Sequence, residues 1–186
     1  FNFSSFIREM YHSFESVADN REIRFVLDNE LPETYKVCFD EAEIEKVFFN
    51  LLSNAFKFTP SEGQVTIRVN TVTQAECELL PHFPAQYSSI LIEAGYLFIE
   101  VIDTGKGFSE QEAEKIFEPF YRSQEDIHRQ ISGTGIGLSL TRSIILQHNG
   151  CIWTESSEAE GTRFLFLLPD TEKQEEGQDE SPVLSK

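Results

Sequence analysis

The sequence predicts an α+β domain, a two-layer α/β sandwich in which a mixed, mainly antiparallel sheet is covered on one face by helices. Two observations support this class. Apolar residues recur at helical spacing over 4–19 and again after Asp40, so each of these helices has one face to bury. The segment 96–103, YLFIEVID, alternates and then runs apolar, as a half-buried strand does. Helices with one apolar face are stable when they cover a sheet.

The elements are expected in the following order. A strand near 1–3 leads into a helix over 4–19, whose apolar residues keep helical spacing. The further elements expected are strands near 22–28 and 35–39, a helix capped by Asp40, strands 64–72 and 96–103, a short helix 110–116, a helix 137–149, and strands 151–156 and 162–168. We expect one domain over 1–169, with an insert at 73–95, followed by an acidic disordered tail or linker at 170–186.

Composition and charge restrict the class of protein. A chain of 186 residues with 17 phenylalanines can form one domain with a sizeable core. Its formal net charge of −17 argues against a nucleic-acid partner, because nucleic acid favours basic surfaces. Three cysteines without a C-x-x-C pair predict reduced thiols and a cytoplasmic location. We see no signal peptide and no apolar run that could span a bilayer, and we expect no direct membrane contact.

The helix after Asp40 carries the first candidate site, within the stretch FFNLLSNAFKFTP (48–60). At 100° per residue, Asn50, Asn54 and Lys57 fall within a sector of roughly 60° beside the apolar stripe. An amide oxygen can coordinate Mg²⁺ whose other ligands are phosphates, and a lysine one turn further on can reach a phosphate. The alternative is an ordinary solvated polar flank, which most amphipathic helices have.

The stretch DTGKGF (103–108) ends the strand 96–103. Asp103 stands where the strand stops, and the glycines at 105 and 107 can bring the backbone close to a ligand. A carboxylate at this place can accept a hydrogen bond from the exocyclic amine of adenine. Ser109 and Glu112 have the spacing of a capping box for the short helix that follows. The alternative for Asp103 is a plain turn in which its side chain bonds its own backbone.

A second glycine-rich stretch, GTGIGLSL (133–140), opens the helix 137–149. Unbonded amides at a helix start can bind phosphate, although the spacing fits neither a P-loop nor a dinucleotide fingerprint. Between FEPFYR (117–122) and these glycines lies a polar run that contains Arg122, His128 and Arg129 and has the composition of a mobile lid. The alternative is a glycine-rich hinge that binds no ligand.

These four stretches, in this order, resemble the N box, first glycine box, F box and second glycine box of the GHKL ATP-binding fold. The likeness is greatest to the catalytic, ATP-binding domain of sensor histidine kinases, and it covers roughly residues 1 to 169. The family pattern N-L-L-x-N-A-x-K-[FY]-T is matched by Asn50, Leu51, Leu52, Asn54, Ala55, Lys57, Phe58 and Thr59, and its closing GT-x-F strand by Gly161, Thr162, Arg163 and Phe164.

The resemblance implies a site for ATP and Mg²⁺. Asn54 would hold the metal, Asn50 would support phosphate or metal geometry, and Lys57 would contact phosphate; these three are the catalytic candidates. Phe58 would lie against adenine, and Asp103 would bind its amine. The implied cofactor-binding set is Asn54, Lys57, Phe58, Asp103, Gly105, Gly107, Phe108, Tyr121, Arg122, Gly133, Thr134, Gly135, Ile136, Gly137, Leu138 and Thr162.

The same likeness separates subfamilies. Hydrolytic GHKL ATPases carry a glutamate at the first N-box position, where this chain has Asn50, so transfer of phosphate to a protein side chain is favoured over hydrolysis. In histidine kinases the acceptor is a histidine followed by an acidic residue on a helical hairpin. None of the four histidines has such a neighbour: they are His12, His82, His128 and His148.

We therefore expect the catalytic module of a longer kinase, with that hairpin and a downstream response-regulator receiver domain as partners. The alternatives are a hydrolytic GHKL ATPase, an anti-sigma-factor-type serine kinase, and a nucleotide-binding module without catalysis.

The insert 73–95 departs from the minimal family pattern, since loops of this length are uncommon without a role or a structure of their own. It is interpreted as a locally packed extension or as a docking surface. The tail 170–186, with six acidic residues and two lysines, could connect to a receiver domain in a hybrid kinase.

Overall fold

A computed structural model describes residues 1–89, 91–113, 115–122, 133–157 and 160–170. Its centre is one five-stranded sheet in the order β1-β2-β3-β5-β4. Only β1 and β2 pair in parallel, and the other three neighbouring pairs are antiparallel. The predicted mixed, mainly antiparallel sheet is therefore confirmed. Its strands are β1 Arg24–Asn29, β2 Gln64–Thr73, β3 Gly95–Asp103, β4 Cys151–Ser157 and β5 Gly161–Pro169.

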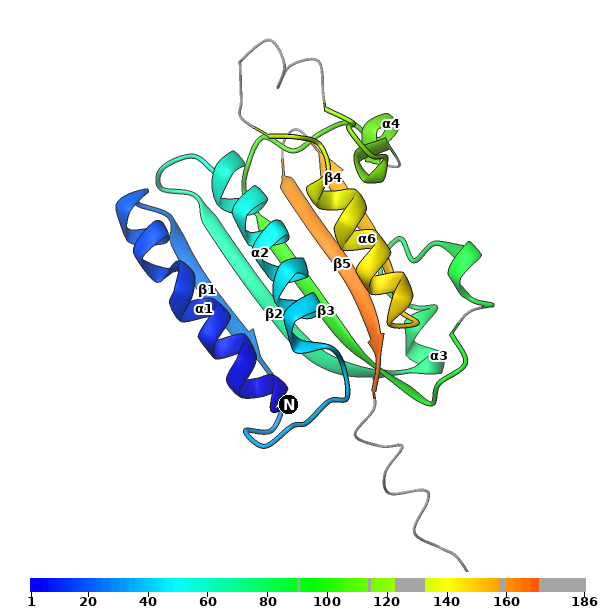
Figure 1. The fold of residues 1–186 in the computed structure, drawn as a ribbon. Coiled ribbons are helices and arrows are strands. Elements are labelled where there is room, and N and C mark those ends of the chain that lie inside the picture. The colour runs from blue at the N-terminus through cyan, green and yellow to red at the C-terminus, as the bar shows by residue number, and fades with distance from the viewer. Residues whose placement is uncertain (90, 114, 123–132, 158–159, 171–186) are drawn as a thin grey trace, which may run out of the picture.

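Three helices lie over one face of the sheet (Figure 1): α1 Phe3–Asn20, α2 Glu41–Phe58 and α6 Gly137–Gln147. The Asp40 side chain accepts a 3.2 Å hydrogen bond from the Glu43 amide, which confirms the predicted cap of α2. Asn2 caps α1 in the same way through the amide of Ser5. Shorter elements are α3 Gln74–Cys77, the 3₁₀ turns Ala85–Tyr87 and Lys115–Phe117, and α4 Glu110–Ala113.

The predicted strands at 1–3 and 35–39 are wrong. The structure has there a single isolated bridge between Asn2 and Lys36, and α1 already begins at Phe3. Because the Asn2 side chain accepts the amide at position 5, the backbone turns into a helix at that point. The predicted helix 137–149 ends at Gln147, since Asn149 takes a left-handed conformation (φ 57°) before Gly150.

The main core fills the space between the helices and the sheet. Leu97, Ile99 and Val101 point from β3 toward the helices, and none of these side chains is exposed. Aromatic rings continue the core between α1 and α2, where Phe6 and Phe48 meet edge to face at 5.6 Å. This packing fixes α2 against the sheet and so determines which way the polar flank of α2 faces.

The insert 73–95 packs against the opposite face of the sheet. The alternate residues of β3, Tyr96 and Phe98, join a second apolar cluster with Trp153, Cys77 and Tyr87. Two hydrogen bonds hold the insert there: the Tyr87 hydroxyl donates to the carbonyl of Ile152, and the Trp153 indole donates to the carbonyl of Pro81. The helices thus cover one face as predicted, while the insert covers part of the other.

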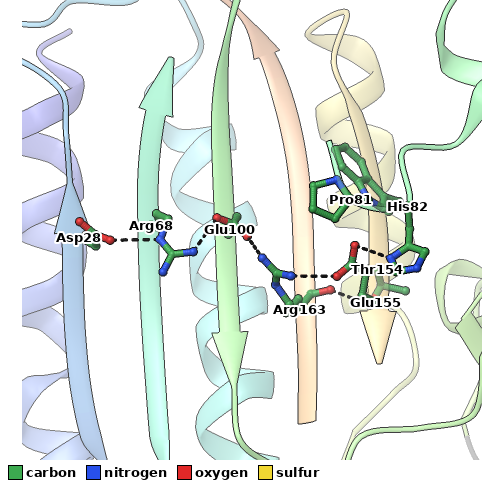
Figure 2. A network of polar contacts seen from close by, with 9 residues as sticks. Asp28, Arg68, Pro81, His82, Glu100, Thr154, Glu155 and Arg163 are labelled. Atoms are coloured by element: carbon green, nitrogen blue, oxygen red, sulfur yellow. Dashed lines mark hydrogen bonds and ion pairs between the residues drawn. The ribbon is translucent and has the colours of Figure 1, made fainter. Parts of the chain in front are cut away.

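A row of charged side chains crosses the same face of the sheet beside the second cluster (Figure 2). At its centre, the buried carboxylate of Glu100 accepts hydrogen bonds from Arg68 and Arg163. In order across the strands and into the insert, the row consists of Asp28, Arg68, Glu100, Arg163, Glu155 and His82. Because positive and negative side chains alternate along the row, side chains of opposite charge lie beside each other on neighbouring strands. These pairs stabilise the arrangement of the strands.

The folded part of the chain includes Asp170. This residue is buried, its amide donates to the carbonyl of Gly95, and it accepts a hydrogen bond from the Tyr35 hydroxyl. The rest of the predicted tail, 171–186, lies outside the described residues. Among the helices that the structure describes, none is long and apolar enough to cross a membrane.

Candidate nucleotide-binding site

A cavity of about 1140 Å³ opens between the flank of α2, the segment that follows β3, and the start of α6. All but two of the predicted site residues line it. These are Asn50, Asn54, Lys57, Phe58, Asp103, Gly107, Phe108, Tyr121, Arg122, Gly133, Thr134, Gly135, Gly137, Leu138 and Thr162. The other two lie next to it: the Gly105 amide donates to the Asp103 side chain, and the carbonyl of Ile136 accepts a hydrogen bond from the Ser139 hydroxyl in the first turn of α6. Stretches far apart in the sequence therefore form one concave surface.

The flank of α2 places Asn50, Asn54 and Lys57 along one side of this cavity. The Asn50 amide donates to the carbonyl of Gly137 at 3.4 Å and lies 3.5 Å from the Thr141 hydroxyl. Asn50 therefore also joins α2 to the first turn of α6. The Lys57 ammonium lies 4.8 Å from the centroid of the Phe58 ring, a cation–π contact that holds both side chains at the cavity wall.

Asp103 lies at the inner end of the cavity, where β3 stops. Its side chain is only 4% exposed and accepts a 2.8 Å hydrogen bond from the Gly105 amide. Burial raises the pKa of Asp103 to about 6, while hydrogen bonds from the Gly105 and Thr162 backbone act in the opposite direction. A carboxylate that has already lost its water can bind the amine of a base with little further desolvation.

Two glycines let the backbone close around the cavity. Gly107 has φ +64°, and a Cβ there would lie 2.0 Å from the carbonyl oxygen of Ser157. Gly135 has φ +72°, and a Cβ there would lie 2.7 Å from the carbonyl oxygen of Tyr121. A side chain at either position would both strain the backbone and collide with a neighbouring strand or turn. These contacts position the turns that carry the predicted glycine boxes.

Basic side chains outnumber the carboxylates of Asp103 and Glu112 in the described lining of the cavity. Lys57, Lys106, Lys115 and Arg122 all line it, although the formal net charge is −17. The amides at the start of α6 add the positive end of a helix dipole. Such a surface attracts a polyanion such as a triphosphate. The remainder of the predicted lid, 123–132 with His128 and Arg129, lies outside the described residues.

Sequence reasoning missed part of the lining, namely Phe49, Ser53, Lys106, Ser109, Gln111, Glu112, Lys115, Ile116 and Phe164. Phe49 and Ser53 each precede a predicted site residue by one position on α2, which was a usable signal. For Glu112 the sequence predicts only a role in the cap with Ser109. Its carboxylate does accept hydrogen bonds from the amide and hydroxyl of Ser109, and also from Tyr121.

The donor set fits a metal that arrives with a nucleotide. Within the described residues, no three histidine, cysteine, aspartate or glutamate side chains gather into a group that could hold a metal ion. The Asn54 amide lines the cavity close to Lys57, so it can supply one neutral oxygen while phosphates supply the others.

The class of this domain follows from its similarity to known proteins. The family model described as "Histidine kinase-, DNA gyrase B-, and HSP90-like ATPase" matches residues 39–172. The match covers most of the chain and includes the helix α2 and the whole cavity lining. The chain therefore belongs to this family of ATP-binding domains.

Within the family, the similar proteins are sensor histidine kinases. The chain is 33% identical over 145 residues to the sensor histidine kinase WalK of Bacillus subtilis, an alignment that covers 78% of the chain and 21% of WalK. It is 37% identical over 152 residues to the sensor kinase CckA of Brucella abortus, covering 82% of the chain and 15% of CckA. The chain thus spans about a fifth or less of the length of these relatives.

Solved structures give the same assignment. The nucleotide-free catalytic domain of the histidine kinase ThkA has a TM-score of 0.71 and 30% identity, with 94% of this chain and 96% of that one covered. The structure of ThkA in complex with the response regulator protein TrrA has a TM-score of 0.65 and 27% identity, covering 94% of this chain and 42% of that one. This fold is therefore that of a histidine kinase catalytic domain.

Proposed function

We propose that this chain binds ATP with Mg²⁺ and transfers the γ-phosphate to a histidine on a separate helical hairpin of the same full-length kinase. The observation that supports this most directly is the cavity itself. It combines the amide and ammonium flank of α2 with a buried aspartate, and it has Asn50 where a hydrolytic enzyme carries a base.

The adenine and the phosphates of ATP bind to different residues of the cavity. Asp103 binds the adenine amine, with Phe58 against the base. Lys57 and Arg122, together with the amides at the start of α6, bind the phosphates. Asn54 supplies the oxygen that would hold Mg²⁺, which when bound neutralises charge on the phosphates.

Transfer is favoured over hydrolysis because position 50, where a hydrolytic enzyme carries its glutamate base, is an asparagine in this chain. An amide such as that of Asn50 cannot take a proton from water, and here it is bonded to the start of α6. Of the two carboxylates among the described lining residues, we assign Asp103 to adenine, and Glu112 already accepts hydrogen bonds from Ser109 and Tyr121. The chain's role is then to hold the donor phosphate for an acceptor that another domain supplies.

We further propose that the phosphate passes from the hairpin to a response-regulator receiver domain. The support is the similarity to ThkA, whose structure was solved with the response regulator protein TrrA. A cytoplasmic setting is consistent with an ATP substrate and with three cysteines that form no disulfide in the described part of the chain, Cys38, Cys77 and Cys151.

The test combines the chain with ATP, Mg²⁺ and the acceptor hairpin of its full-length kinase, added as a separate polypeptide. We expect acid-labile phosphate on the hairpin, slow ATP turnover by the chain alone, and no stable phosphate on the chain's own histidines. A hairpin whose acceptor histidine is replaced by alanine is the control. Rapid hydrolysis by the chain alone, without transfer to the hairpin, would move the assignment to the hydrolytic ATPases.

A further inference from the structure

A second, smaller hollow adjoins the nucleotide cavity on the helical side of the molecule. It lies between α1 and α2 and has a volume of about 440 Å³. Three residues of α2, Phe49, Ser53 and Lys57, line both hollows, so the two share a wall. We call the second hollow the α1–α2 groove.

The α1–α2 groove has an aromatic floor and an exposed apolar rim. The rings of Phe14 and Phe56 stack with centroids 5.6 Å apart and planes 8° apart, and both residues are buried. The ring of Phe49 rests against Phe14 at 5.6 Å, yet Phe49 remains 59% exposed. Val17, from α1, is 39% exposed at the same groove. Isolated exposed apolar residues are common, but a joined set over a buried floor is typical of an interaction surface.

The groove is also positively charged. Arg21 and Lys57 line it, in a chain whose formal net charge is −17. The Arg21 guanidinium donates to the carbonyl oxygens of Phe56 and Thr59 at the end of α2, so these bonds hold the cation in place without cancelling its charge. A partner that covers this groove should therefore present apolar side chains together with an acidic one.

The groove lies at the phosphate end of the site. Lys57, which we assign to phosphate, lines both hollows, whereas Asp103, which we assign to adenine, lines only the nucleotide cavity. Phosphoryl transfer requires the acceptor atom roughly 3–3.5 Å from the phosphorus and in line with the bond that breaks. The α1–α2 groove borders this end through Lys57, so the body of a protein acceptor can rest there while its reacting atom reaches the phosphate.

From these observations we propose that the α1–α2 groove seats one helix of the phosphoacceptor hairpin. Apolar side chains of that helix cover Phe49 and Val17, and the acidic residue beside the acceptor histidine faces Arg21 and Lys57. This inference rests on the proposed function and adds the surface by which the acceptor is recognised.

The test measures the initial rate of transfer against hairpin concentration for Val17→Glu. Val17 lines the groove and does not line the nucleotide cavity. A glutamate at position 17 stands four residues before Arg21, a spacing at which opposite charges attract on a helix, so the substitution is compatible with a stable α1. We expect the KM for the hairpin to rise about tenfold or more, with the Kd for ATP changed less than about twofold. The matched control is Leu146→Glu on α6, where a leucine with 42% exposure lines neither hollow. Its KM should stay as in the unmodified chain.

The outcomes separate this inference from the function on which it rests. Transfer by the unmodified chain with an unaltered KM for Val17→Glu would overturn the groove assignment alone. ATP binding without any transfer to the hairpin would overturn both. If Val17→Glu fails to fold, Val17→Ala should raise the KM in the same direction but less, and an unchanged KM would again reject the groove. Hydrogen exchange over 13–21 should slow when the hairpin is added, and unchanged exchange would contradict the contact.

Discussion

The burial of Asp103 predicts an unusual dependence of stability on pH. The pKa of this carboxyl is raised from an ordinary 3.8 to about 6 in the folded chain, mainly by burial. Because the pKa is higher in the folded chain than in the unfolded one, the folded chain binds the proton more tightly. The contribution of this proton to the free energy of unfolding is therefore fully present below pH 3.8 and is lost as the pH rises to about 6. A shift of about two units corresponds to about 3 kcal/mol, an upper limit for the penalty at neutral pH.

Replacing Asp103 by asparagine removes this penalty, because an amide does not ionise. The difference in unfolding free energy between Asp103→Asn and the unmodified chain should therefore grow with pH. Roughly half of the 3 kcal/mol, about 1.4 kcal/mol, should appear between pH 5 and pH 8. Any constant effect of the amide on packing cancels when the two pH values are compared.

Urea unfolding without nucleotide, at pH 5 and at pH 8, measures this quantity for both proteins. Other titrating groups affect both proteins alike and drop out of the difference. A difference in unfolding free energy that is the same at both pH values would refute the claim that Asp103 is buried and ionised in the free protein. In ATP titrations the same substitution should weaken binding by about 1–3 kcal/mol and reduce the preference over GTP. An unchanged preference would reject its role at adenine.

Three further substitutions test the site and the sheet. Asn54→Ala should remove most of the Mg²⁺ dependence of ATP affinity while leaving the melting temperature unchanged. Calorimetry measures ATP binding with Mg²⁺ and with EDTA, and equal ATP affinities of the unmodified chain under the two conditions would contradict the metal assignment. Gly107→Ala should destabilise the fold by about 2 kcal/mol or more, since its Cβ would lie 2.0 Å from a carbonyl oxygen at a φ of +64°. Gly95→Ala, whose Cβ would meet nothing closer than 3.5 Å, is its control in thermal melts. Glu100→Gln should lower the free energy of unfolding by about 2 kcal/mol because it leaves two arginines of the charged row without their buried partner. In urea unfolding, a loss no larger than that caused by the exposed Glu33→Gln would show that the row is not stabilising.

Features with a local cause could be predicted from the sequence. The cap by Asp40, the apolar stripe of α2 and the alternation of β3 each depend on residues only a few positions apart. The same periodicity places Asn50, Asn54 and Lys57 on one flank, and the structure has them along one side of the cavity. The strand expected at 1–3 was wrong because a single capping contact at Asn2 decided the local structure.

Relations between distant segments were decided only by the tertiary structure. The sequence around the insert does not indicate that the Tyr87 hydroxyl donates a hydrogen bond to the carbonyl of Ile152. The insert is buried against the face of the sheet that the three helices leave open, and local sequence does not determine which face that is. The raised pKa of Asp103 has the same origin: a carboxylate followed by glycine is ordinary, and only packing of β5 and the following turn removes its water. The sequence by itself therefore determined the family and the chemical groups of the site. The tertiary structure decided their burial, their charge state and the groove beside them, since these depend on contacts between segments that periodicity does not connect.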